Sequence, residues 1–202
     1  KGNTTQGFNS MGANTTGSRN TAVGYSSLDA STTGIDCVAI GYESLTSNST
    51  GNDNTAVGKE SLKDNTTGSN NVAVGFQALQ NNTTATGNTA IGYESLDANT
   101  TGDRNTAVGY QSQLNNTTGL ANTSVGSSSM QDNTTGQQNT ALGHEALRDN
   151  TTANFNTAIG KSALQDNTTG ASNTALGALA LDANTTANNN TAIGKGALTV
   201  NT

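Results

Sequence analysis

The feature that most constrains this chain is an uninterrupted seventeen-residue repeat. The pentapeptide at 105–109, NTAVG, has close copies that begin at residues 20, 37, 54, 71, 88, 122, 139, 156, 173 and 190, and a looser copy begins at residue 3. Twelve turns of one pattern therefore fill the 202 residues with no insertion or deletion between them. A fixed period of this kind is typical of a fold in which each unit packs only on its neighbours.

All turns can be written in one register, with the Asn of the pentapeptide as position one. The pattern is then Asn-Thr-Ala-(Val/Ile/Leu)-Gly-Tyr-Glu-(Ser/Ala)-Leu-Asp-Ala-Asn-Thr-Thr-Gly, followed by two variable residues. Position nine is Leu or Met in nearly every turn, with Gln113-Leu114 as the one slip. Gly at position five of all twelve turns disfavours a helix. Two short strands per turn, at positions two to four and seven to nine, fit better, with the Gly as the bend between them.

Position four is the candidate core column. It carries a large aliphatic residue in eleven turns, and the side chains of positions two and four share one face of an extended strand. We expect that face to point into the coil. The predicted core residues are Val23, Ile40, Val57, Val74, Ile91, Val108, Val125, Leu142, Ile159, Leu176 and Ile193.

Composition decides between a globular domain and a solenoid. Only 31% of the residues are hydrophobic and 3% aromatic, which is too little for an ordinary globular core of this length. The sequence therefore predicts an all-β parallel β-solenoid of twelve coils that forms a single repeat domain over residues 1–202. Stacked at about 4.8 Å per coil, the coils make a rod about 55–60 Å long. Because residue 1 is Lys and residue 202 falls inside a repeat, we expect the chain to be a piece of a longer protein.

Position three is Ala in ten turns, on the face opposite the predicted core. Small residues there would let the backbones of separate chains approach closely, although Ala could instead fit a tight bend within one chain. We therefore expect self-association, as a parallel homotrimer or a filament. The candidate chain–chain interface consists of Ala22, Ala39, Ala56, Ala73, Ala90, Ala107, Ala141, Ala158, Ala175 and Ala192.

Positions twelve and fourteen are a candidate ladder surface of stacked Asn and Thr side chains. It includes Asn65, Thr67, Asn82, Thr84, Asn99, Thr101, Asn116, Thr118, Asn133 and Thr135. Identical amides and hydroxyls can hydrogen-bond the copies above and below them. The same Asn-x-Thr triplets are glycosylation sequons, so glycans are one reading of this surface. An ice-binding surface built from the Asn and Thr ladders is another.

The pattern Asn-Thr-Ala-Val-Gly-Tyr-x-Ser-Leu resembles the Asn-Ser-Val-Ala-Ile-Gly head repeats of trimeric autotransporter adhesins. It is still more similar to the Asn-Thr-Ala-Leu-Gly-Tyr-Gln-Ala-Leu repeats of phage tail-fibre-like and bacterial surface proteins, which often precede a self-cleaving chaperone domain. The likeness covers essentially all twelve turns. It implies a left-handed parallel β-roll with three chains side by side. This chain departs from the adhesin heads in its longer turn, which carries a longer Asn-Thr-Thr loop.

Charge and reactive residues argue against several functions. The formal charge of -6 is spread over only 11% charged residues, so the sequence has no basic stripe for nucleic acid. It also has no apolar run long enough for membrane insertion. His144 is the only histidine and occupies a variable position, and Cys37 is the only cysteine and replaces an Asn of the repeat. Glu43, Glu60, Glu94 and Glu145 share position seven without the distinct surroundings that an acid–base pair needs. We expect neither an enzyme, nor a cofactor, nor a metal site.

Position six carries Tyr25, Tyr42, Phe76, Tyr93 and Tyr110. These residues either offer an aromatic strip to a sugar or partner, or cover the edge of the coil as strand-forming residues. Taken together, the sequence predicts an extracellular structural or adhesive rod at a cell surface or in a virion fibre. Its expected partners are further copies of itself and a host surface or glycan. An ice-binding solenoid is the alternative.

Overall fold

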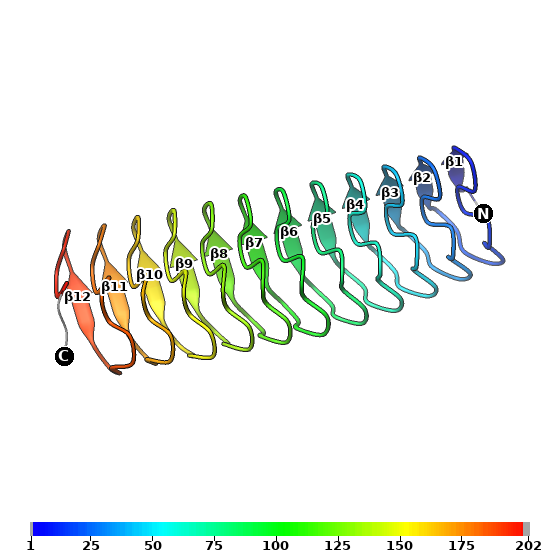
Figure 1. Cartoon of the computed structure of the whole chain (residues 1–202). Coiled ribbons are helices and arrows are strands. Elements are labelled where there is room, and N and C mark those ends of the chain that lie inside the picture. Colours follow the sequence, from blue (N-terminus) through cyan, green and yellow to red (C-terminus); the bar gives the residue numbers. More distant parts are fainter. Residues whose placement is uncertain (1, 200–202) are drawn as a thin grey trace.

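Each turn of the repeat contributes one three-residue strand, and the strands stack in sequence order into one parallel sheet (Figure 1). The computed structural model describes residues 2–199. Its strands are β1 (Thr4–Gln6), β2 (Thr21–Val23), β3 (Val38–Ile40), β4 (Thr55–Val57), β5 (Val72–Val74), β6 (Thr89–Ile91), β7 (Thr106–Val108), β8 (Thr123–Val125), β9 (Thr140–Leu142), β10 (Thr157–Ile159), β11 (Thr174–Leu176) and β12 (Thr191–Ile193). The predicted all-β parallel solenoid is thus confirmed. Figure 1 shows a rod with β1 at one end and β12 at the other.

The register is the same at every strand pair, because each residue lies beside its equivalent seventeen residues away. Ala56 pairs with Ala73, for example, and Ala73 pairs with Ala90. No strand is offset from its neighbours, so residues at one repeat position form continuous columns along the rod.

The second strand predicted at positions seven to nine is wrong. Positions seven and nine adopt left-handed backbone conformations, with φ of 50° at Glu94 and 56° at Leu96. Such residues bend the chain and do not belong to an extended strand. Their N–H groups still find partners in other coils: Glu94 donates to the Phe76 carbonyl at 2.9 Å and Leu96 to the Ser112 carbonyl at 3.0 Å. Coil stacking therefore continues through the bends without a second sheet.

The predicted core column lies on the outside. Position three points inward, and Ala107 is completely buried, whereas Ile40 is 39% exposed and Leu142 is 47% exposed. The coil interior is narrow, so the face that carries only a methyl group fits inside and the face that carries branched side chains does not. The outward residues are Val23, Ile40, Val57, Val74, Ile91, Val108, Val125, Leu142, Ile159, Leu176 and Ile193.

The predicted chain–chain interface is wrong for the same reason. Its members have at most 2% exposure and face the interior of their own chain, so another chain cannot reach them. They are Ala22, Ala39, Ala56, Ala73, Ala90, Ala107, Ala141, Ala158, Ala175 and Ala192. The Leu side chains of position nine, such as Leu96, are also fully buried and complete the apolar interior with this column. That interior divides into two clusters, one ending at Ala107 and one beginning at Met130.

Two internal asparagine ladders complete the interior. At position one, Asn105 donates its backbone N–H to the Asn88 side-chain oxygen at 2.8 Å and its amide to the Gly119 carbonyl at 2.8 Å. At position twelve, the Asn99 amide donates to the Asn82 side-chain oxygen at 3.2 Å and to the Gly102 carbonyl at 3.0 Å. These inward amides find partners in neighbouring coils and in their own loop, as buried polar groups require. The Asn14 side-chain oxygen is the exception in the position-twelve ladder.

Glycine at position five is required by both conformation and space. Gly109 has φ of 137°, a value that side chains of L-residues rarely allow. A Cβ atom at this position would also run into the backbone carbonyl of Gly126 in the next coil. The predicted bend at position five is therefore real, and it follows the single strand of each coil.

Candidate functional site

The outer face of the sheet is the most distinctive surface of the rod. We call it the sheet face, and it consists of positions two and four of β2 to β12. Position two is Thr in nine of these strands and Val in two, and position four is always Val, Ile or Leu. Eleven strands therefore present 22 side chains without a charge among them.

The aliphatic column of the sheet face is only partly covered by its own chain. Ile91 is 40% exposed and Leu176 is 44% exposed, and the Val residues of this column are half-buried. Because the strands pair without offset, these side chains join into one continuous apolar stripe along the rod. Contiguous exposed apolar patches in soluble proteins mark sites of interaction.

The predicted ladder surface divides between the inside and the outside of the coil. The threonines Thr67, Thr84, Thr101, Thr118 and Thr135 are exposed, as predicted, while the asparagines Asn65, Asn82, Asn99, Asn116 and Asn133 are completely buried. The Asn65 amide, for example, donates to the Asn48 side-chain oxygen at 2.8 Å and to the Gly68 carbonyl at 2.9 Å. The short Asn side chain points inward because it closes the loop from within. The amide that a glycan would occupy is thus already engaged in the folded coil.

The aromatic residues of position six form two stacks. Ring centroids are 5.3 Å apart for Tyr25–Tyr42 and 5.2 Å apart for Tyr93–Tyr110, with the ring planes nearly parallel. Phe8 extends the first stack and Phe76 the second. Because the rings cover each other's faces, they present mainly their edges to solvent. A sugar that binds by lying flat on an aromatic face finds little of that surface here.

Lys59 occupies the gap between the two aromatic stacks. Its ammonium nitrogen lies 5.8 Å from the centroid of the Tyr42 ring and 5.3 Å from that of Phe76. The same nitrogen is 3.5 Å from a Glu60 carboxylate oxygen. Position six therefore forms one column from Phe8 to Tyr110, with a cation in place of its central ring.

The carboxylates of position seven bind neighbouring side chains. Glu43 lies 2.7 Å from the Lys63 ammonium, and the hydrogen bond with Lys63 lowers the pKa of Glu43. Glu94 accepts a hydrogen bond from the Gln111 amide at 2.8 Å. Asp97, at position ten, differs from them because burial, with the charge of Glu94 as a smaller cause, raises its pKa to about 6. These contacts link successive coils and do not converge on a shared reactive centre.

The other candidate reactive residues are isolated from one another. His144 is half-exposed at position six, 3.4 Å from the Glu145 carboxylate. Cys37 is fully buried, and desolvation raises the pKa of its thiol. Within residues 2–199 there is no pocket and no group of three His, Cys, Asp or Glu residues placed to hold a metal ion. The same residues contain no helix that is long and apolar enough to cross a membrane.

Comparisons of this chain with protein-family models, with curated proteins and with solved structures found no match.

The sequence prediction places the sheet face inside the coil because bulky aliphatic side chains usually indicate burial. The signal that identifies it is the contrast between positions three and four. Position three tolerates only Ala, Ser and Thr, as expected for a residue in a narrow interior, whereas position four varies freely among Val, Ile and Leu. Variation in volume along one column indicates that no rigid wall of the same chain opposes it.

Proposed function

We propose that this chain is a structural rod of an extracellular fibre or adhesin, in which three parallel copies pack their sheet faces against one another. The uncharged sheet face with its exposed aliphatic column is the observation that carries the proposal. A partner that contacts the side chains of every strand must have the same rise per coil and the same repeat period as this rod. A second copy of the chain has both.

The likeness of the repeat to adhesin-head and tail-fibre repeats favours three copies over two. At about 4.8 Å per strand and about 3.3 Å per residue, the sheet face measures roughly 50 Å by 10 Å, or about 500 Å². Each chain contributes this same area in a dimer and in a trimer. Two such faces bury about 1,000 Å² in total, which is below the 1,200–2,000 Å² of typical stable interfaces, so contacts beyond the sheet face must add to the assembly.

In this assembly the rod acts by its geometry. Closed coils have no free side edges, and three joined rods resist bending better than one. The loops that carry Thr67 and its equivalents stay on the outside, where a host surface or a glycan is the ligand we propose for an adhesive form.

Molar mass in solution and one sheet-face variant test the proposal. Light scattering should give three times the mass of one chain. Val108→Asp places three carboxylates together inside the assembly, so it should yield a folded single chain with an unchanged circular dichroism spectrum. Thr118→Asp, in an exposed loop, is the matched control and should remain trimeric. A single-chain mass for the unmodified protein contradicts the proposal.

Ice binding is a second candidate function. Its candidate surface is the sheet face, and not the loop ladders expected from the sequence. Among residues 2–199, the hydroxyl groups of Thr55, Thr89 and Thr157 form no hydrogen bonds, and they stand in one column beside the aliphatic column. A regular face of free hydroxyls and methyl groups can order water. A trimer would bury this face, so inhibition of ice recrystallisation by a monomeric protein would favour this candidate over the fibre rod.

A further inference from the structure

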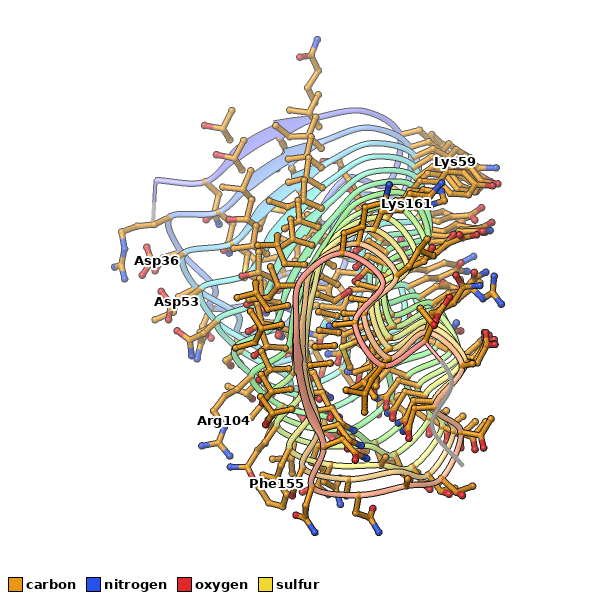
Figure 2. All side chains as sticks on the ribbon, turned by 90° about the vertical axis from the view of Figure 1, so that its left-hand side faces the viewer. Asp36, Asp53, Lys59, Arg104, Phe155 and Lys161 are labelled. Atoms are coloured by element: carbon orange, nitrogen blue, oxygen red, sulfur yellow. The ribbon has the colours of Figure 1, made fainter. Side chains whose placement is uncertain are left out.

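Two columns of side chains flank the sheet face. The first column is position seventeen, two residues before each strand, which we call the entry edge. The second column is position six, two residues after each strand, which we call the exit edge. Figure 2 shows them on opposite sides of the coils: Asp36, Asp53, Arg104 and Phe155 project on one side, and Lys59 and Lys161 lie on the other.

The two edges are complementary at the level of the same strand. The entry and exit residues are Asp53 and Lys59 at β4, Arg104 and Tyr110 at β7, and Phe155 and Lys161 at β10. The first pair joins opposite charges and the other two join a cation with an aromatic ring. At two further levels both residues are small: Ala121 and Ser127 at β8, and Ser172 and Ala178 at β11. At β6 the small entry residue Gly87 lies at the level of Tyr93.

None of these pairs can form within one chain. The partners are six positions apart in the sequence, and the extended strand between them holds their Cα atoms roughly 15–20 Å apart. An ion pair requires its charged atoms to lie within about 4 Å of each other. The complementarity therefore has a physical effect only between copies of the chain.

The entry-edge residues are available for such contacts. Among the described residues, the side chains of Asp53 and Arg104 form no hydrogen bond or ion pair, and Phe155 is 59% exposed with no ring beside it. On the exit edge Lys161 is likewise unpaired within the described residues. The Lys59 ammonium lies 3.5 Å from Glu60, but its side chain stays 52% exposed. Arg19 is different, because its guanidinium is bound to the Asp36 carboxylate at 2.6 Å. Arg19 is therefore engaged within its own chain.

We propose that the entry edge of each chain packs against the exit edge of the next chain at the same strand level, which closes a parallel ring. Such an interface is heterologous, because it joins two different edges and uses each edge once. It also sets the register. A slip of one coil in either direction places Asp53 opposite an aromatic ring and removes the Phe155–Lys161 match. This inference rests on the proposed assembly and names the contacts that orient it.

Paired cysteines test the seam directly. In a Cys37→Asn background, the variant Asp53→Cys/Lys59→Cys carries one thiol on each edge at the level of β4. A short bis-maleimide linker should convert it into a covalent trimer on a denaturing gel. Each single variant should give at most traces of cross-linked product, because equivalent edges do not meet. Asp36→Cys/Lys59→Cys, which pairs edges one coil apart, is the register control and should remain largely uncross-linked.

Charge reversal provides a second measurement. Asp53→Lys and Lys59→Asp should each weaken assembly by about 1.4- to 5-fold per seam, the range for exposed ion pairs, and the double variant should recover the loss.

The results separate this inference from the proposed function. A trimeric mass with cross-linking only in single or slipped variants overturns the seam and leaves the trimeric rod standing. A single-chain mass for the unmodified protein overturns both. Efficient trimer cross-linking of the in-register pair alone supports both.

Discussion

Gln113 donates its side-chain amide to the backbone carbonyl of Thr106 at 3.1 Å, while its own side-chain oxygen is buried without a partner. This pair lies at the boundary between the two apolar clusters of the interior. The other fully buried position-nine residues are Leu or Met, so Gln113 interrupts the column with a half-satisfied polar group.

Gln113→Leu should therefore stabilise the rod. The change removes a buried unsatisfied acceptor and joins the two apolar clusters, so we expect the free energy of unfolding to rise by about 1–3 kcal/mol. Thermal or denaturant unfolding measures this. The converse change, Leu96→Gln, should destabilise by a similar or larger amount, and equal stability of Gln113→Leu and the parent would contradict the account.

Ser31→Asn should repair the ladder of position twelve. The side-chain oxygens of Asn14 and Ser31 are both buried without partners, because Ser31 is too short to donate as an Asn does in the equivalent coils. An Asn at 31 can donate to Asn14, as Asn99 does to Asn82. We expect a gain of about 1 kcal/mol in unfolding free energy. Thr33→Asn, in an exposed position two residues away, is the control and should produce no such gain.

The two recurring glycine columns of the repeat, positions five and fifteen, should differ in how much stability a Gly→Ala substitution costs. Gly109→Ala forces a methyl group into the neighbouring backbone at positive φ, so a loss of several kcal/mol is expected. A Cβ at Gly119, position fifteen, would also meet a carbonyl of the next coil, but the backbone there is not in the left-handed region and Ala85, Ala153 and Ala187 already occupy that position. Gly119→Ala should therefore cost less than about 1 kcal/mol. Melting temperatures of the two variants provide the comparison, and similar losses would show that position five is not special.

Asp97 should make stability depend on pH in an unusual direction. Its pKa is about 6 in the folded chain against an ordinary value of 3.8, so the folded state holds the proton more tightly than the unfolded state. Its contribution is most favourable below pH 4 and is lost as pH rises to about 6. Asp97→Asn should therefore match the parent near pH 4 and melt at a higher temperature at pH 7. A temperature difference that does not change with pH would contradict this.

Inward and outward substitutions on one strand should have separate effects. Ala107→Asp buries a charge inside the coil and should unfold the neighbouring turns, whereas Val108→Asp should leave the coil intact and affect only assembly. Circular dichroism separates the two outcomes. Loss of structure in Val108→Asp alone would mean that position four is the true interior.

The sequence by itself determined the period, the parallel in-register stacking and the bend at Gly109. A repeat without insertions places residue i beside residue i+17, and Gly at position five of every turn marks the place where a side chain would collide with the next coil. The Asn-Thr-Thr-Gly segment is a loop, as its residue types predict.

The tertiary structure decided which side of the strand is inside. Successive side chains of a strand point to opposite faces, so Ala107 and Val108 must lie on opposite sides. This alternation does not determine which of the two faces inward. The answer depends on the width of the coil, which is set by the left-handed bends at positions seven and nine and by Leu96 opposite the strand. In a space that narrow, the methyl group of Ala fits and the branched side chain of Val does not. Stacked asparagines fill the rest of the interior. The bulky aliphatic side chains of position four therefore lie on the surface, and the Asn amides lie inside.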